Sequence, residues 1–209
     1  MDPKDRIIRE AAAMFLDEGV KSVRMDDIAT RLGVSKRTLY EMFGDKQDLL
    51  ERSMEWLFEG KRREMCAQVE VATNVIEEIF FMLGSMRRDE KEAALVTNLK
   101  KFYPEIYRRL DEETHKYSYK EFDKMLDRGI EQGFFLPSIN KELALVTLVY
   151  TMHSLFEKKY HFELIKNISH RDAFRYVIVS FFRGLATHKG IEAIDEAVNN
   201  YKVKTENRI

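Results

Sequence analysis

The sequence has few residues that interrupt helices or cross-link chains. Its 209 residues include three prolines and a single cysteine, so an intramolecular disulfide is excluded and long segments are free to be helical. No apolar stretch resembles a signal peptide or a membrane span, so we expect a cytoplasmic protein that does not contact membranes. A formal net charge of -1 excludes nucleic-acid binding through bulk positive charge, so any such binding requires a local patch.

Apolar residues make up 44% of the chain, which is ample for a core, and they recur at helical spacing. No alternating stretch is followed by the Asn-Gly or Asp-Gly pair that is typical of a hairpin. We therefore predict an all-α fold with essentially no sheet. Residues 1–48 are predicted to form a small three-helix domain, and residues 49–209 a larger helical domain.

Residues 25–46 have the pattern of two short helices joined by a tight turn. Apolar residues share one face of the first helix, and two aspartates occupy its first turn, where carboxylates complement the helix dipole. Gly33 follows, and only glycine readily takes the left-handed conformation that ends a helix sharply. Ser35 is placed to cap the next helix, and Val34 and Leu39 have the spacing of a hydrophobic staple. The pattern predicts a helix-turn-helix.

The second of these helices has the side chains that DNA recognition requires. Leu39 and Phe43 share its inner face, which leaves basic and hydroxylic residues outside. Lysine and arginine pair with phosphates or guanine, and hydroxyls suit phosphate oxygens or base edges. Asp45 is a predicted cap of the following helix, and Lys46 in its first turn stands where a phosphate is favoured.

From about Asp5 to about Leu50 the chain resembles the DNA-binding domain of the TetR family of transcriptional regulators. The resemblance rests on residues 12–19, Asp27–Ile28–Ala29, Gly33–Val34–Ser35, Thr38–Leu39–Tyr40, Phe43, and Lys46 with Leu49. It implies contacts between operator DNA and the recognition helix, and a phosphate held by Lys46. The predicted DNA-binding residues are Arg24, Ser35, Lys36, Arg37, Thr38, Tyr40 and Lys46.

Three positions depart from the family pattern. Arg24 stands where threonine is frequent, so the second helix is capped elsewhere, for example at Ser22, or Arg24 itself reaches a phosphate. Arg37 stands where small residues are frequent, and Met42 near a position where histidine or tyrosine is common. The base sequence of the operator is therefore not inherited from the resemblance.

Two later segments are apolar nearly all the way round and require cover on both sides. They lie within residues 142–162 and 171–187, and we predict that they form a homodimer interface as a four-helix bundle of two helices from each subunit. A long helix from about residue 45 to 69 is expected to link the two domains. The resemblance implies the same arrangement.

Aromatic and methionine side chains are abundant in the larger domain and suit an apolar cavity with a few polar groups. The resemblance implies that a small molecule bound there shifts the linking helix and releases DNA, and we expect an apolar or aromatic effector. The candidate ligand-binding residues are Phe102, Tyr103, Tyr107, Phe122, Met125, Tyr150 and His153.

Catalysis is not expected. Glu112 and His115 have the Glu-x-x-His spacing of helical di-iron sites, but no second copy occurs, so we predict no metal site and no cofactor. Glycine-rich phosphate loops and nucleophile motifs are also missing from the sequence. The predicted function is a repressor that binds a pseudo-palindromic operator as a homodimer and is released by an effector. The alternative is a helix-turn-helix activator, or a regulator that acts through protein partners without a ligand.

Overall fold

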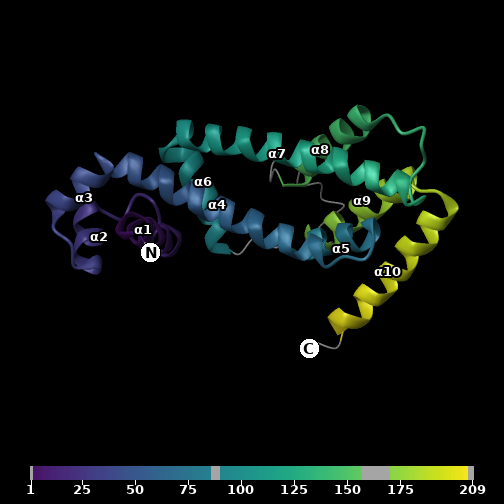
Figure 1. Cartoon of the computed structure of the whole chain (residues 1–209), viewed down its shortest axis with the longest axis horizontal. Helices are drawn as coiled ribbons and strands as arrows, with labels where there is room; N and C mark the ends of the chain where they lie inside the picture. The colour runs from purple at the N-terminus through teal and green to yellow at the C-terminus, as the bar shows by residue number, and fades with distance from the viewer. Residues whose placement is uncertain (1, 86–89, 157–169, 207–209) are drawn as a thin grey trace, which may run out of the picture. The chain divides into compact units, whose positions relative to one another are not determined.

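The computed structural model describes residues 2–85, 90–156 and 170–206, which are helical almost throughout (Figure 1). Within these ranges no strand forms, and Phe135 and Ala186 make an isolated antiparallel bridge. None of the described helices is both long and apolar enough to cross a membrane. The prediction of an all-α fold is confirmed. The described helices are α1 (Pro3–Glu18), α2 (Met25–Leu32), α3 (Lys36–Phe43), α4 (Lys46–Glu70), α5 (Val75–Ser85), α6 (Glu90–Phe102), α7 (Pro104–Glu131), α8 (Lys141–Phe156), α9 (His170–Leu185) and α10 (His188–Glu206).

The chain folds as two compact units, to which α4 and α7 both contribute. The N-terminal unit comprises Met1–Ala67 and Met86–Lys116, and the C-terminal unit comprises Gln68–Ser85 and Tyr117–Ile209. The N-terminal unit is larger than the DNA-binding domain predicted over residues 1–48, because α6 and the first half of α7 share its core. The functional boundary at residue 48 stays a prediction.

One apolar core holds the helices of the N-terminal unit together. Helix α1 packs against α2 and α6, and α2 packs against α3. Fully buried side chains from every helix of the unit meet there, which excludes water from the inner faces of the short helices α2 and α3. The largest of these side chains are Phe15, Ile28, Leu39, Phe43, Leu49, Leu50, Met54, Leu99 and Ile106.

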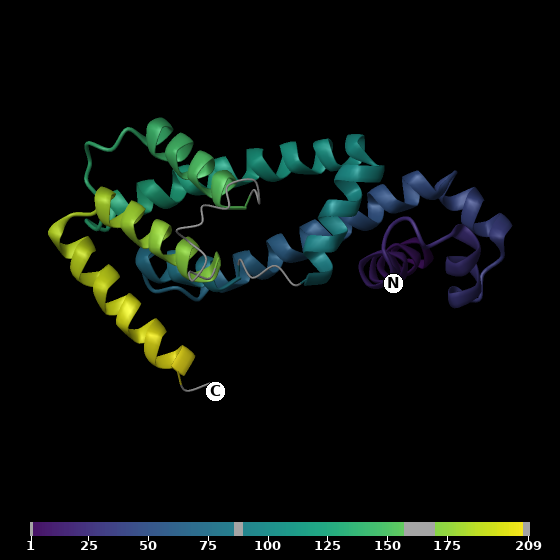
Figure 2. The ribbon, with the colours of Figure 1, turned by 180° about the vertical axis from the view of Figure 1, so that it is seen from behind.

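The C-terminal unit has a second core. Helix α8 packs against α9, and α10 packs against both α9 and α5 (Figure 2). Aromatic rings fill its centre, with Phe135 stacked on Phe182 at a centroid distance of 5.8 Å and Phe122 at 6.4 Å from Phe182. Such ring pairs add to the free energy of burying their apolar area, so this cluster holds α7 and α9 together.

A partly buried ion pair joins α5 to α7 in the C-terminal unit. Glu78 of α5 is 7% exposed and accepts a hydrogen bond from Arg128 of α7. Burial raises the pKa of Glu78, and the Arg128 guanidinium opposes that rise. Removing one partner would leave an uncompensated charge, so the pair fixes α5 against α7.

The junction between α9 and α10 is tighter than the sequence analysis expected. Helix α9 ends at Leu185, two residues before the predicted limit of 187, because Ala186 pairs with Phe135. Thr187 then caps α10, its Oγ1 accepting the N–H of Gly190 at 3.2 Å. A Cβ atom on Gly190 would lie 2.0 Å from the carbonyl oxygen of Phe134. Only glycine allows this approach of α10 to the backbone after α7.

Replacing Gly190 with alanine tests this junction. The new methyl group must displace the Phe134 backbone, so we expect the free energy of unfolding to fall by about 1–3 kcal/mol. The matched control is Gly60→Ala in α4, where nothing lies within 4 Å of the new Cβ atom and alanine favours a helix by about 1 kcal/mol. Thermal or urea unfolding measures both. Equal stability of the two variants would contradict the packing described.

Candidate nucleic-acid interface

The turn of the helix-turn-helix is built from local backbone chemistry. Helix α2 begins at Met25, and the carboxylate of Asp27 accepts the backbone N–H of Arg24 at 2.8 Å. The backbone of Arg24 therefore starts the helix, Ser22 does not cap it, and the Arg24 side chain stays exposed. Gly33 ends α2 with φ of 66°, the left-handed conformation predicted for it.

The cap of α3 is also as predicted. Ser35 Oγ accepts the backbone N–H of Thr38 at 3.0 Å and lies 2.7 Å from the Thr38 hydroxyl. Both hydroxyls are therefore engaged in starting the helix. Leu39 and Phe43 are buried against the core, with exposed fractions of 0% and 1%, which turns the opposite face of α3 toward solvent. That face carries Lys36, Arg37 and Tyr40.

A second pair of cations, Arg24 and Lys46, lies at the starts of α2 and α4. Asp45 caps the helix, its Oδ1 accepting the N–H of Asp48 at 2.8 Å, as predicted. Lys46 occupies the first position of α4 and is half-buried. Burial lowers the pKa of Lys46 most, Asp27 opposes that shift, and Arg24 adds to it. The starts of α2 and α4 thus lie close together, with two cations beside the exposed helix α3.

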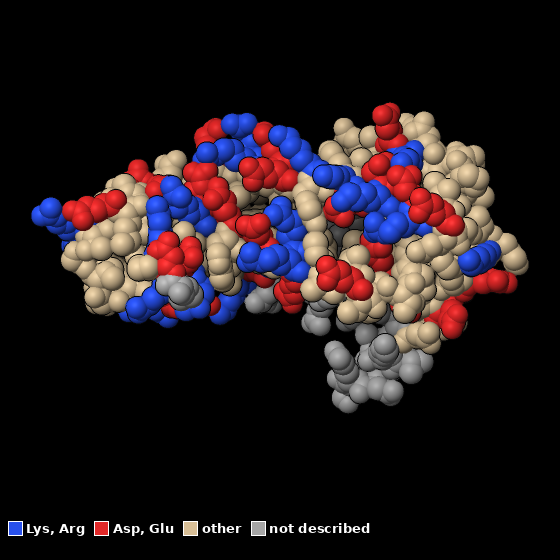
Figure 3. Space-filling model, viewed as in Figure 1, with Lys and Arg blue, Asp and Glu red and all other residues tan. Residues whose placement is uncertain are grey.

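The two cations of the first turn of α3 both contact carboxylates. Lys36 pairs with Asp26 of α2, and Arg37 Nε donates to Glu41 Oε1 at 2.7 Å. All four side chains are more than half exposed, so each pair stabilises the fold by about 0–1 kcal/mol at most. Figure 3 shows the same mixing over a whole face, where acidic and basic side chains alternate. The candidate interface therefore carries a few cations that are paired with carboxylates, and not a continuous basic surface.

Sequence reasoning missed one cation of this surface. The ammonium of Lys4 lies 5.4 Å from the centroid of the Phe43 ring, which brings the first turn of α1 beside the end of α3. The two residues are far apart in the chain, and no spacing rule predicts such a contact. Only the Asp2 cap of α1, whose carboxylate accepts the N–H of Lys4 at 3.0 Å, is visible as a local pattern.

The candidate ligand-binding residues are divided between the two units. Phe102, Tyr103 and Tyr107 pack, partly buried, against the N-terminal core. Burial raises the pKa of Tyr103, and the Tyr107 hydroxyl donates to Asp111 at 2.8 Å. In the C-terminal unit, Met125 is buried and Phe122 packs beside it, whereas Tyr150 is 72% exposed on α8. The side chain of His153 lies outside the described residues.

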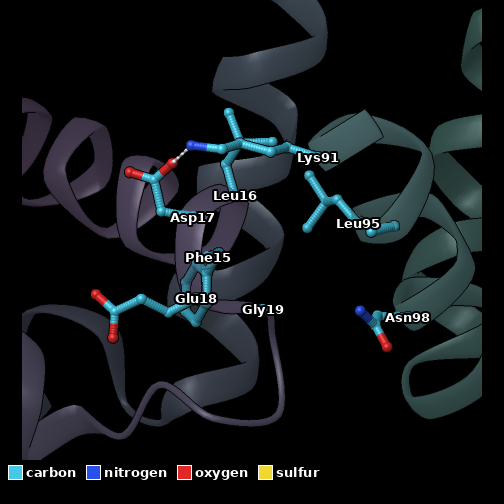
Figure 4. A pocket seen from close by; sticks show the side chains of 9 residues that line it. Phe15, Leu16, Asp17, Glu18, Gly19, Lys91, Leu95 and Asn98 are labelled. Atoms are coloured by element: carbon cyan, nitrogen blue, oxygen red, sulfur yellow. Dashed lines mark hydrogen bonds and ion pairs between the residues drawn. The ribbon is translucent and has the colours of Figure 1, made fainter. Parts of the chain in front are cut away.

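A shallow pocket lies between α1 and α6 within the N-terminal unit (Figure 4). Its volume is about 210 Å³, and an ion pair of 2.7 Å between Lys91 and Asp17 crosses its edge. The Lys91 ammonium lowers the pKa of Asp17. Pockets for drug-sized ligands span about 300–1,000 Å³, so this one is too small for such an effector. It is lined by Phe15, Leu16, Asp17, Glu18, Gly19, Lys91, Ala94, Leu95 and Asn98.

The Glu-x-x-His pair of α7 takes part in surface ion pairs. Glu112 contacts Arg108 at 3.0 Å, and His115 lies 3.4 Å from Asp111. Among the residues that the structure describes, no three histidine, cysteine, aspartate or glutamate side chains are grouped so that they could hold a metal ion.

Comparison with known proteins identifies the segment that contains the helix-turn-helix. Residues 7–52 match the family described as bacterial regulatory proteins, tetR family. The repressor KstR2 of Mycolicibacterium smegmatis is 26% identical over 154 residues, covering 67% of this chain and 71% of the repressor.

Two solved structures share the fold. A transcriptional regulator of Cytophaga hutchinsonii has a TM-score of 0.68 at 18% identity, with 88% of this chain and 98% of the other covered. A putative regulator of Saccharomonospora viridis in complex with choline has a TM-score of 0.66 at 18% identity, with the same two coverages of 88% and 98%.

The matched segment contains the whole helix-turn-helix, from the buried Ile7 of α1 to the first turns of α4. The relatives that match are transcriptional regulators and not enzymes. Residues 7–52 therefore match the DNA-binding domain of the tetR family, and the chain is similar to transcriptional regulators that contain this domain.

Proposed function

We propose that the protein is a repressor that binds a pseudo-palindromic operator as a homodimer in the cytoplasm, and that a small molecule releases it. The observation that carries the proposal is the exposed face of α3, where Lys36, Arg37 and Tyr40 project from a helix whose other face is buried. A short, rigid helix with this face suits the major groove. KstR2, the relative described above, is itself named a repressor.

The DNA contacts fall into two groups. Lys36, Arg37 and Tyr40 are placed for base edges and nearby phosphates, whereas Arg24 and Lys46 stand at the starts of α2 and α4, where backbone N–H groups also favour phosphate. Ser35 and Thr38 act first as the cap of α3, and their hydroxyls reach DNA only through bonds left over from that cap.

The dimer is supported by an uncovered stripe on α8. Leu143, Val146 and Tyr150 are 63%, 48% and 72% exposed and follow one another at helical spacing. Thr147 lies between them. Its hydroxyl donates to the carbonyl of Leu143 at 2.7 Å, so this hydroxyl is already hydrogen-bonded within the helix. On α9, which packs beside α8, Tyr176 is 75% exposed. A second copy of the same stripe is the matching cover.

Pairing two subunits would set the distance between their two α3 helices. In a symmetric dimer the two α3 helices enter successive major grooves when they are about 34–36 Å apart. An effector that binds one dimer geometry more tightly shifts the population toward it and changes that spacing.

The effector is proposed to be apolar or aromatic. Phe122 and Met125 belong to the core of the C-terminal unit, which is rich in aromatic rings, and such cores line ligand cavities in helical proteins. The Saccharomonospora viridis regulator was solved with choline, so a protein of this fold holds a small organic molecule.

Replacing Lys46 with alanine tests the phosphate contact. Loss of one contact in each subunit should reduce the slope of log K against log salt by about 2 for the dimer and weaken binding to all DNA sequences alike. Lys116→Ala, an exposed lysine at the middle of α7, is the control and should leave the slope unchanged. Fluorescence anisotropy at four salt concentrations measures both, and an unchanged slope for Lys46→Ala would remove this residue from the interface.

Replacing Tyr150 with aspartate tests the dimer. A charge on the most exposed residue of the apolar stripe should give monomers in sedimentation velocity at micromolar concentration, and operator affinity should fall by about tenfold or more, since one half-site is lost. Leu136→Asp introduces the same charge at an exposed residue between α7 and α8 and should stay dimeric. A monomeric wild-type protein would refute the proposal.

A reporter gene behind the operator tests repression. Replacing Lys36, Arg37 and Tyr40 together with alanine should raise expression to the level of cells that lack the regulator, because the major-groove contacts are gone. In wild-type cells an apolar or aromatic effector should raise expression in the same way. Lower expression in the triple variant would show an activator, and wild-type repression that no small molecule relieves would support a regulator without a ligand.

A further inference from the structure

The recognition helix carries a carboxylate next to its most exposed arginine. The Arg37 side chain is 88% exposed and the Glu41 side chain 60%, and they stand one turn apart on α3. A solvated pair at this spacing contributes little to stability. A negative charge on the face that approaches DNA also repels phosphates. Neither effect explains a glutamate here, so its geometry toward Arg37 matters more than its contribution to stability.

The atoms in this contact leave the outer edge of the arginine available. Glu41 Oε1 accepts from Nε of Arg37, the nitrogen nearest the backbone, at 2.7 Å. Among the described residues no carboxylate is paired with the two terminal nitrogens of Arg37. Those two nitrogens form the planar edge that matches O6 and N7 of guanine. The glutamate thus fixes the guanidinium without occupying its base-reading edge.

The neighbouring cation behaves differently. Lys36 contacts Asp26 of α2, and its ammonium is a point charge on a flexible stem with no planar edge to orient. Asp26 therefore cannot preset a bidentate contact for Lys36. Of the two ion pairs at the start of α3, only the pair of Arg37 and Glu41 has the geometry that favours one base.

We propose that Arg37 reads a guanine in each half-site and that Glu41 is a positioning residue that holds Arg37 for this contact. The inference rests on the proposed operator binding. It adds the identity of the base that Arg37 contacts and the residue that orients the Arg37 side chain. Holding the side chain in advance lowers the conformational entropy lost on binding, which favours the matching base over the others.

Selection from a pool of random DNA duplexes with the full-length protein tests the assignment. The wild-type protein should enrich a sequence with one guanine in each half-site. Arg37→Ala should lose the preference for that guanine, a change of about 10- to 100-fold at that base pair. Glu41→Gln should lower the preference at the same base pair by about twofold, because the exposed pair holds Arg37 only weakly, and should raise affinity for random DNA, because one negative charge is removed. A general effect on folding would not change the preference at a single base pair.

Glu18→Gln is the matched control. Glu18 at the end of α1 pairs with Arg31 of α2 at 3.2 Å in the same unit, and both side chains are about half exposed. Its loss should leave every base preference unchanged. A Glu41→Gln profile identical to wild type would overturn the positioning role. So would a changed preference at a different base pair, which would show that Glu41 reads its own base. If wild-type protein enriches no sequence, the proposed function fails as well.

Discussion

The burial of Leu39 and Phe43 is the constraint on which the DNA-binding surface depends. Helix α3 has only eight residues, Lys36–Phe43, and a helix this short is unstable alone in water. Its two buried side chains anchor it to a core shared by α1, α2, α4, α6 and α7. Because these two residues fix the rotation of the helix, they also decide which side chains face outward. The set of side chains that α3 presents to solvent is therefore a consequence of packing inside the N-terminal unit.

The balance of charge limits how strongly one subunit can bind DNA. The chain has 35 basic and 36 acidic residues, and even the first turn of α3 is neutralised by nearby carboxylates. A single interface of this kind binds DNA with low affinity, because it neutralises few phosphates and releases few counterions. Doubling the contacts through a dimer raises affinity without adding charge to either subunit. In the proposed dimer, the exposed apolar stripe on α8 would thus compensate for the small number of cations on α3.

The features that were predicted correctly from the sequence depend on local chemistry. Gly33, Ser35 and Asp45 mark helix ends through contacts within four residues, and the structure confirms all three. Contacts between distant residues were not predicted. The approach of Lys4 to Phe43 depends on how α1 packs, and α10 starts where Gly190 meets a carbonyl 56 positions earlier in the chain. The ligand-binding residues were predicted as a list of aromatic and methionine residues for the same reason, since periodicity does not say which of them share a cavity.

The most direct test of paired recognition is the dependence of affinity on half-site spacing. Duplexes are prepared with the two selected half-sites at their natural separation, or moved apart by about five base pairs, which places them on opposite faces of the DNA. Paired recognition predicts that one dimer binds the natural duplex, and that the insertion lowers affinity to the level of a single half-site. Equal affinity for both duplexes, or one monomer bound to each, would contradict it.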